Sequence, residues 1–363
     1  MDVEERLSLI RDMAEEIVTE EELRGLLELK RNPVAYDGFE PSGLANIAFG
    51  ILRPINLQAL LSAGVRFKLL LADWYAWINN KFGGDLEKIR LAGEYFIDVW
   101  RAAGVDLNKV EVLWTSDIVR NEEYWKKVIL IAKHTTLSRT MRSVSIMGRK
   151  MGELKETAQL FYPMMQAADI FWLDVDICQL GLDQRRANIL ARDVAGKLGW
   201  KKPVVVSHHM LMGLEGVKQP EGYDTNPKYD IQISSKMSKS KPSSGIFVHD
   251  SAEEIAAKVR AAYCPAKVVQ NNPVLEYAKF IVFRKFRTLK IERPEKYGGP
   301  IELASYKELE RLFADGTIHP LDLKNAVALK IDELVSGIRE HFQKDDRARE
   351  LYNNLVSGQS VTR

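Results

Sequence analysis

The chain has 363 residues, of which 46% are hydrophobic and 28% charged, and its formal net charge is +2. This composition is ordinary for a globular protein of two or three domains, and so small a positive excess neither demands nor excludes a polyanionic partner. The two cysteines lie far apart in apolar surroundings, which argues against a disulfide framework or a zinc site and fits a reducing compartment. Because no signal pattern and no apolar run of roughly 18 residues is present, we expect a cytoplasmic protein that spans no membrane.

The first thirty residues are predicted to form two short amphipathic helices, the second capped by Thr19 with Glu22 three residues later. Short apolar runs then alternate with longer helical patterns. Five of these runs are candidate strands, at residues 34–36, 67–72, 110–114, 173–177 and 204–207. This alternation predicts an α/β fold, a Rossmann-like parallel five-stranded sheet with helices on both faces.

Ligands of such sheets bind outside the carboxyl ends of the strands, where the strand order reverses. The loops after the candidate strands, which should hold the site, comprise residues 38–50, 73–80, 115–117, 179–184 and 208–209. The first of them fits neither common phosphate fingerprint. In the second, Asp73 either caps a helix or lines the cleft. In the last, the adjacent His208 and His209 point differently, so we expect no structural metal there.

A polar stripe lies in the segment FYPMMQAADIFW. Tyr162, Gln166 and Asp169 have the spacing i, i+4 and i+7, which places them on one face of a helix that is otherwise apolar. Such a stripe is usually the solvent-facing side of a helix. This one contains no Lys, Glu or Arg, and its phenol, amide and carboxylate would suit a small amphoteric ligand.

The fourth candidate strand is followed by QLGLDQRRANILARD. Gly181 permits a tight turn, and Gln184 falls in the first helical turn. Asp183 either caps that helix or accepts hydrogen bonds from ribose hydroxyls, and the residues leave both readings open.

Residues 219–244 are rich in Pro, Gly, Ser and Lys and predict a long loop. The loop contains KMSKS, in which Lys236 and Lys239 could close over a triphosphate and stabilise the charge on its leaving group. A solvated basic loop is the common alternative, but this string is typical of class I aminoacyl-tRNA synthetases.

Beyond residue 250 the pattern is mostly helical. Apolar residues recur at spacings of three and four, at Val327, Ile331, Leu334, Ile338 and Phe342. We therefore expect a catalytic domain at residues 1–250 and a C-terminal α-helical domain at residues 251–363.

Eight pieces of the sequence, taken in order, carry a resemblance to one family. They are YDGFEPSG, LLLADWYAWINNKFGGDLEKIR, YPMMQAADI, DICQLGLDQRRANILAR, SHHML, KMSKSKPSSGIF, AYCPAKVV and HPLDLKNAVA. From about residue 20 to its end, the chain resembles the tyrosyl-tRNA synthetases of the archaeal and eukaryotic type.

This resemblance implies a tyrosine–tRNA ligase activity in two steps. L-Tyrosine would react with ATP to give tyrosyl-adenylate and pyrophosphate, and the tyrosyl group would then pass to the 3′ end of tRNA-Tyr. It also implies a diffusible Mg²⁺ that enters with ATP and is held mainly by its phosphates. The family further implies a homodimer and an anticodon-binding role for the helical domain.

The resemblance also implies roles for particular residues. Tyr36 and Asp169 would bind the substrate's phenolic hydroxyl, while Tyr162, Gln166 and Gln184 would hold its amino group. The ATP-binding set would be Gly38, Ser42, Asn46, Asp183, Lys236 and Lys239, with the two lysines as catalytic residues. Tyr297 and His319 would stack on the first anticodon base, and Asp322 would hydrogen-bond its edge.

One piece departs from the family. Class I enzymes place a His-Ile-Gly-His-like element after the first strand, and here Asn46, Ile47, Ala48 and Phe49 stand in its place. The Asn46 amide can still donate a hydrogen bond, whereas Phe49 cannot. Two other readings stay open. A tryptophanyl-tRNA synthetase shares the fold but does not need the phenol-binding pair, and a catalytically silent RNA-binding paralogue would fit the missing histidines.

Overall fold

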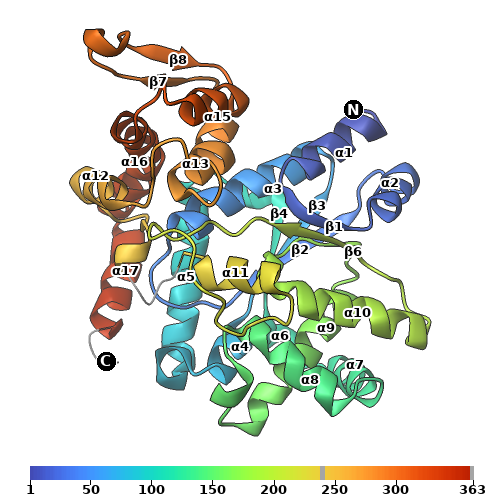
Figure 1. Ribbon diagram of the computed structural model, residues 1–363. Helices are drawn as coiled ribbons and strands as arrows, with labels where there is room; N and C mark the ends of the chain where they lie inside the picture. Colours follow the sequence, from blue (N-terminus) through green and yellow to red (C-terminus); the bar gives the residue numbers. More distant parts are fainter. Residues whose placement is uncertain (238–241, 360–363) are drawn as a thin grey trace.

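The computed structural model describes residues 1–237 and 242–359, and a single sheet lies at its centre (Figure 1). The strands of this sheet are β1 (Ala14–Val18), β2 (Val34–Phe39), β3 (Arg66–Leu71), β4 (Val110–Trp114), β5 (Ile177–Cys178) and β6 (Val204–His208). Their order is β1-β6-β5-β2-β3-β4, with β1 antiparallel to β6 and all other neighbours parallel. The predicted α/β class with a parallel sheet is confirmed, and an antiparallel edge strand is added to it.

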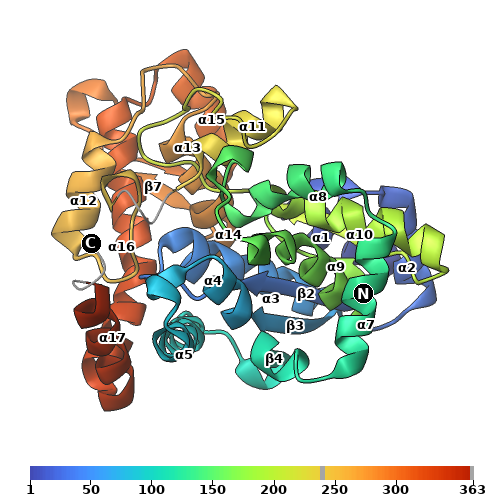
Figure 2. The same cartoon turned by 90° about the horizontal axis from the view of Figure 1, so that it is seen from below.

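Helices cover both faces of the sheet, as the strand sequences require. In β3, Phe67, Leu69 and Leu71 enter one apolar cluster and Leu70 enters another, because alternate side chains point to opposite faces. The first face packs on α1 (Val3–Arg11), α2 (Glu20–Leu29), α3 (Arg53–Ser62) and α5 (Leu86–Ala102). The second packs on α4 (Asp73–Ile78), α6 (Thr115–Ile118), α7 (Glu122–Lys133), α9 (Tyr162–Trp172) and α10 (Arg185–Leu198), with α8 (Leu137–Ser143) beside α9 (Figure 2).

The N-terminal segment contains a strand that the sequence did not predict. Both predicted helices form, and Thr19 and Glu22 exchange the two hydrogen bonds of a capping box. Between the helices, β1 pairs with β6, so that Ile17 lies opposite Val206. Alanine and two glutamates in five residues do not favour a strand locally, so pairing with a distant part of the chain decides the conformation.

Two other predicted segments have different boundaries in the structure. The candidate strand at residues 173–177 forms later than predicted, since α9 ends at Trp172, Asp174 turns the chain with a φ of 49°, and β5 begins at Ile177. The long loop at residues 219–244 contains a helix, α11 (Pro227–Ser235). Asn226 caps α11 and proline occupies its first position, two helix-start signals that the loop-like composition concealed.

The chain beyond residue 250 is mostly helical, as predicted (Figure 1). It forms α12 (Ala252–Ala261), α13 (Pro273–Tyr277), α14 (Phe283–Lys285), α15 (Tyr306–Asp315), α16 (Pro320–Lys344) and α17 (Asp346–Gln359), with a hairpin of β7 (Leu289–Ile291) and β8 (Ile301–Leu303). The predicted apolar stripe lies on α16, where Val327, Ile331 and Ile338 are fully buried.

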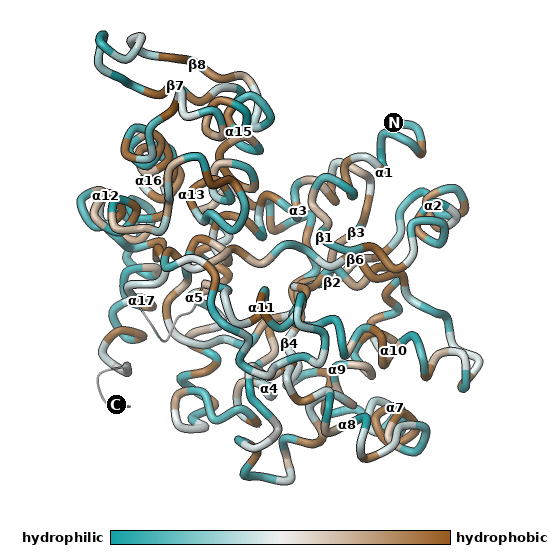
Figure 3. Tube along the Cα trace, viewed as in Figure 1, coloured by the Kyte–Doolittle hydropathy of each residue, from teal (hydrophilic) through white to brown (hydrophobic). Residues whose placement is uncertain are grey.

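The apolar core continues from the sheet into the helical part. One cluster of buried residues extends from Leu7 in α1 to Leu355 in α17, and α17 packs against α5. Arg347 of α17 also forms an ion pair with Glu94 of α5 at 3.1 Å. Figure 3 shows a concentration of apolar residues around β6 in the sheet. None of the helices in the described ranges is long and apolar enough to cross a membrane.

Candidate active site

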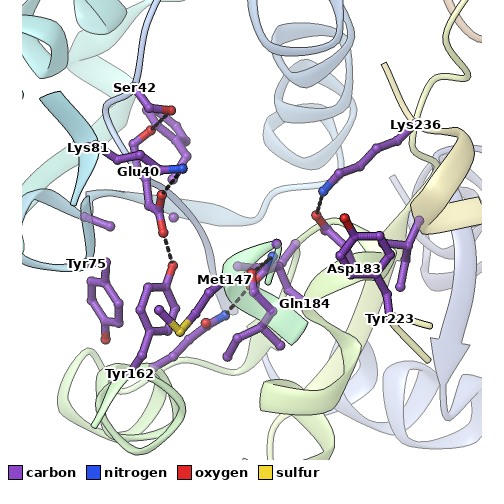
Figure 4. A pocket seen from close by; sticks show the side chains of 18 of the residues that line it. Glu40, Ser42, Tyr75, Lys81, Met147, Tyr162, Asp183, Gln184, Tyr223 and Lys236 are labelled. Atoms are coloured by element: carbon purple, nitrogen blue, oxygen red, sulfur yellow. Dashed lines mark hydrogen bonds and ion pairs between the residues drawn. The ribbon is translucent and has the colours of Figure 1, made fainter. Parts of the chain in front are cut away.

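A cleft of about 770 Å³ opens at the carboxyl ends of β2 and β5. These two neighbours mark the point where the strand order reverses, because β3 and β4 extend the sheet from β2 while β6 extends it from β5. The cleft is lined by the predicted residues Tyr36, Gly38, Ser42, Tyr162, Gln166, Asp169, Asp183, Gln184 and Lys236. Figure 4 shows Tyr75 and Tyr162 toward one end of this cleft, and Asp183, Tyr223 and Lys236 toward the other.

One end of the cleft is a cluster of phenols around a buried carboxylate. Asp169 accepts hydrogen bonds from the hydroxyls of Tyr75 and Tyr124, the second at 2.9 Å. Burial outweighs these two hydrogen bonds and raises the pKa of Asp169 to about 7. The hydroxyl of Tyr36 is buried without a hydrogen-bond partner among the described residues, and burial and nearby charges, including Asp169, raise its pKa well above the ordinary value. A buried hydroxyl without a partner is costly, so this end of the cleft is suited to a ligand with a hydroxyl of its own.

The middle of the cleft carries hydrogen-bonding groups in linked pairs. The Tyr162 hydroxyl donates to Glu40 at 2.7 Å, and Gln166 Nε2 donates to Gln184 Oε1 at 3.1 Å. Gln184 is fixed in turn because its Nε2 donates to the carbonyl of Ile146 at 3.0 Å. The α9 helix presents Tyr162, Gln166 and Asp169 on the face that lines the cleft, so the polar stripe of the sequence is not a solvent-facing side.

The other end of the cleft is charged. Lys236 Nζ lies 2.7 Å from Asp183 Oδ2, and this lysine holds the pKa of Asp183 below its ordinary value although burial acts in the opposite direction. Asp183 therefore forms an ion pair rather than a helix cap. A Cβ at Gly181 would lie 2.5 Å from Asp183 Oδ1, so the absence of a side chain there makes room for the carboxylate.

One predicted ATP-binding residue, Asn46, is not part of this arrangement, and another, Lys239, lies outside the described residues. Asn46 is buried and does not line the cleft, and its Oδ1 accepts a hydrogen bond from the Phe49 amide at 3.1 Å. The ring of Phe49 packs edge-on against Phe39 with 4.5 Å between centroids. In this structure the turn that replaces the histidine element therefore serves packing.

Asp73 and His208, which the sequence left unassigned, have structural partners. Asp73 begins α4, and its Oδ1 accepts hydrogen bonds from the backbone amides of Trp74 and Ser116 at 2.9 and 3.0 Å, which ties α4 to α6. His208 is buried against Gln179 at 2.8 Å, and burial lowers its pKa to about 3. The cleft is lined by neither residue. No group of three or more His, Cys, Asp or Glu within residues 1–237 and 242–359 is placed to hold a metal ion.

His209 joins three distant parts of the chain. Its Nδ1 lies 3.0 Å from Glu15 in β1, and its Nε2 lies 3.2 Å from Glu276 in α13, as an ion pair without hydrogen-bond alignment. The ring stacks on Phe280 with 4.0 Å between centroids. Burial alone would lower the pKa of His209, but the two carboxylates outweigh it and raise the pKa to about 9.

We expect this cluster to make folding stability depend on pH in the alkaline range. The folded-state pKa of His209 is above the unfolded value of 6.5, so its contribution is complete below pH 6.5 and is lost as the pH rises through 9. The loss amounts to about 3 kcal/mol of unfolding free energy. Urea unfolding at pH 6.5 and pH 9.5 measures it, and His209→Gln should remove most of the difference. An equal pH dependence in wild type and variant would contradict this assignment.

The predicted anticodon residues gather at one end of the helical part. Tyr297 is 64% exposed in the turn between β7 and β8, and His319 caps α16, with Asp322 in the first turn of that helix. Arg293 links these two places, because it donates to the carbonyl of Gly299 at 2.9 Å and to that of Thr317 at 2.8 Å.

Several residues of the cleft were not predicted from the sequence. They are Glu40, Arg53, Tyr75, Lys81, Lys218 and Tyr223. Glu40 lies within YDGFEPSG and could have been found there. The spacing of Arg53 from Asn46 gives no signal for the cleft, because residues 48–52 form a π-helix and Asn46 does not line the cleft. Nothing in the local sequence marks Lys218 or Tyr223 as cleft residues, because α11 positions them. The buried Asp230 of α11 accepts a hydrogen bond from the amide of Tyr223 at 2.8 Å.

The chain is similar in sequence and structure to known proteins. The family model of class I tRNA synthetases (W and Y) matches residues 28–220 and 229–336, and the chain belongs to this family. A tyrosine–tRNA ligase of Sulfurisphaera tokodaii is 47% identical to it, over 100% of this chain and 99% of that protein. A cytoplasmic tyrosine–tRNA ligase of Arabidopsis thaliana is 44% identical, over 98% and 89% of the two chains. A crystal structure of tyrosyl-tRNA synthetase from Pyrococcus horikoshii, complexed with L-tyrosine, is 42% identical with a TM-score of 0.88, over 98% of this chain and 100% of that one. The family resemblance seen in the sequence is confirmed.

Proposed function

We propose that the protein is a tyrosine–tRNA ligase. The observation that carries this proposal is the tyrosine-rich end of the cleft, where the Asp169 carboxylate lies close to the Tyr36 hydroxyl, which has no partner in the part of the chain that the structure describes. A tyrosine side chain placed there would find an acceptor and a hydroxyl in need of a partner. An indole ring offers one N–H donor and no acceptor, so the Tyr36 O–H would find no acceptor on it, which argues against tryptophan.

The cleft also supports a nucleotide beside the amino acid. With the phenol at Asp169, the amino group of tyrosine would reach Tyr162, Gln166 and Gln184, and its carboxylate would face the charged end at Asp183 and Lys236. A carboxylate oxygen of tyrosine attacks the α-phosphorus of ATP, and the bond from that phosphorus to the pyrophosphate oxygen breaks. Lys236 is placed to stabilise the charge on pyrophosphate, while Asp183 accepts from ribose hydroxyls. A Mg²⁺ ion would arrive with ATP and be held mainly by phosphate oxygens.

Tyrosine-dependent exchange of pyrophosphate into ATP tests this proposal, with tryptophan and phenylalanine run in parallel. We expect exchange with tyrosine and little with the other two amino acids. Exchange with tryptophan alone would support the related enzyme. No exchange with any of them would favour a silent RNA-binding protein, which is the reading that the packed Asn46 turn favours.

We further propose that the helical part, residues 251–363, binds the anticodon of tRNA-Tyr through Tyr297, His319 and Asp322. Exposed aromatic rings and hydrogen bonds to base edges are the usual means of reading single-stranded RNA. The transfer step then joins the tyrosyl carbonyl to the terminal ribose hydroxyl of the tRNA and releases AMP.

Asp322→Ala should lower kcat/KM for tRNA about 10- to 150-fold, because a lost hydrogen bond to a charged group is worth roughly 1.5–3 kcal/mol. Pyrophosphate exchange should not change, since Asp322 does not line the cleft. The control is Asp332→Ala on the same helix, whose carboxylate pairs with Arg339 at 2.6 Å. If exchange and aminoacylation fall together, Asp322 supports the fold and does not contact RNA.

A homodimer is also proposed. Ile129 and Leu130 in α7 and Leu137 in α8 are exposed apolar side chains close together in the sequence, which is consistent with a covered surface. Sedimentation equilibrium tests this, and a monomer at micromolar concentration would reject it. We also propose a cytoplasmic location, because the similar protein of Arabidopsis thaliana is named as a cytoplasmic enzyme.

A further inference from the structure

Arg53 lies at the first position of α3 and lines the cleft with Gly38 and Gly43. Arg53 is the part of the helical segment after the glycine-rich turn that reaches the cleft, whereas the side chain of Asn46, seven residues earlier, accepts from the backbone of Phe49. The segment therefore presents the Arg53 guanidinium to the cleft. This position follows residues 46–49, where the histidine element would stand.

The guanidinium of Arg53 is held in place by two neighbouring side chains. Its Nη1 donates to Asp37 Oδ2 at 2.7 Å, and its Cζ lies 5.4 Å from the ring centroid of Phe39. Asp37 has only 1% of its side chain exposed, against 21% for Arg53. Burial raises the pKa of Asp37 to about 6 against the effect of Arg53, so the carboxylate depends on this arginine. Asp37 therefore anchors one edge of the Arg53 guanidinium, and the rest of the guanidinium is accessible from the cleft.

The position of Arg53 in the cleft is close to the charged end. Its charge contributes to the low pKa of Asp183 and to the low pKa of His208, so the guanidinium lies near both groups. A guanidinium has five N–H donors in one plane, and Asp37 is the acceptor for one of them among the described residues. The other cleft cations are lysines, which are point charges on flexible stems, and Lys236 and Lys81 each lie near a carboxylate.

We propose that Arg53 is a phosphate-binding catalytic residue, which contacts ATP in the place of the histidine element that residues 46–49 lack. Anchored by Asp37, it presents a preorganised fork to a phosphate oxygen, a geometry in which arginine forms two parallel hydrogen bonds. The inference rests on the proposed function, since it assigns one more residue to the ATP side of the same cleft.

The experiment compares Asp37→Asn with the double variant Asp37→Asn/Arg53→Gln. The double variant replaces the buried ion pair by two neutral amides, so it avoids an unpaired buried charge. We expect it to raise KM for ATP at least tenfold over Asp37→Asn and to lower kcat for exchange, while the dissociation constant of tyrosine changes less than threefold by calorimetry. The KM for ATP of Arg53→Lys should lie between those of wild type and the double variant. Lysine keeps the positive charge but cannot form two parallel hydrogen bonds to one phosphate.

Arg192→Gln is the matched control. Arg192 forms a partly buried pair with Glu22 at 2.7 Å and does not line the cleft, so its loss should lower thermal stability and leave KM for ATP unchanged. Equal KM and kcat for ATP in the single and double Asp37 variants would overturn the proposal. An equal loss of tyrosine affinity would also overturn it, since Arg53 would then support the whole cleft.

Binding of a non-hydrolysable ATP analogue, measured by calorimetry, separates this proposal from the proposed function. If wild type shows no exchange with any amino acid but Asp37→Asn/Arg53→Gln still binds the analogue at least tenfold more weakly than Asp37→Asn, the ligase function fails and the phosphate contact stands. If exchange with tyrosine is normal and analogue binding is equal in the two variants, the ligase function stands and the role of Arg53 fails.

Discussion

At pH 8, above the raised pKa of Asp169 of about 7, Asp169→Asn should lower kcat/KM for tyrosine about 30- to 150-fold, the effect of losing a charged hydrogen-bond acceptor worth about 2–3 kcal/mol. Phenylalanine has no hydroxyl to bind, so its kcat/KM should change little. The selectivity for tyrosine over phenylalanine should therefore shrink by the same factor. Pyrophosphate exchange with each amino acid at subsaturating concentration measures both numbers.

The structure gives a matched control for this substitution. Asp176, next to β5, has 1% of its side chain exposed and pairs with Lys30 at 2.8 Å, but it does not line the cleft. Asp176→Asn should lower stability and leave selectivity unchanged. If Asp169→Asn reduces activity with both amino acids equally, the carboxylate serves only to hold Tyr75 and Tyr124 in place.

Lys236→Ala should reduce kcat for pyrophosphate exchange about 100-fold, the scale on which loss of one group stabilising transition-state charge is felt. The dissociation constant of tyrosine should stay within about threefold, because the lysine lies at the charged end of the cleft beside Asp183 and away from Tyr75, which donates to Asp169 (Figure 4). Stopped-flow measurement of adenylate formation separates the two quantities.

Lys258→Ala is the comparison for Lys236. Lys258 also forms a partly buried ion pair, with Asp250 at 2.6 Å, and it is not part of the cleft. A loss of exchange in both variants would point to general destabilisation. A large rise in the tyrosine dissociation constant of Lys236→Ala, with adenylate formation unchanged at saturation, would assign the lysine to the amino acid.

The sequence predicted the central architecture well, because buried parallel strands and amphipathic helices have distinct local patterns. It also located Tyr162, Gln166 and Asp169 on one face of a helix, since helical spacing alone determines that relation. It failed at β1, where glutamates form a strand only because the edge of β6 is available to pair with.

The roles of neighbouring side chains were harder to predict. That Tyr75 and Tyr124 donate to Asp169 depends on the packing of α4 and α7 against α9, which no spacing in the sequence encodes. Asn46 resembled a substitute for a histidine, but its orientation depends on a hydrogen bond to the Phe49 amide and on the burial of the whole turn. No spacing in the sequence marks Arg53 for the cleft, and only its hydrogen bond to the buried Asp37 shows that it is anchored.

The continuous core described above has a consequence for how the protein unfolds. The residues just after KMSKS pair with the turn after β2, since Ile47 donates to the carbonyl of Ile246 at 2.9 Å and Val248 to that of Ala45 at 3.0 Å. A Cβ on Gly50 would lie 2.5 Å from Val248, so these two segments are in close contact. The α17 helix packs against α5, so a fragment ending at residue 250 would expose the surface of α5 that α17 covers. Differential scanning calorimetry of the intact chain should show one cooperative transition, with a calorimetric enthalpy equal to the van't Hoff enthalpy.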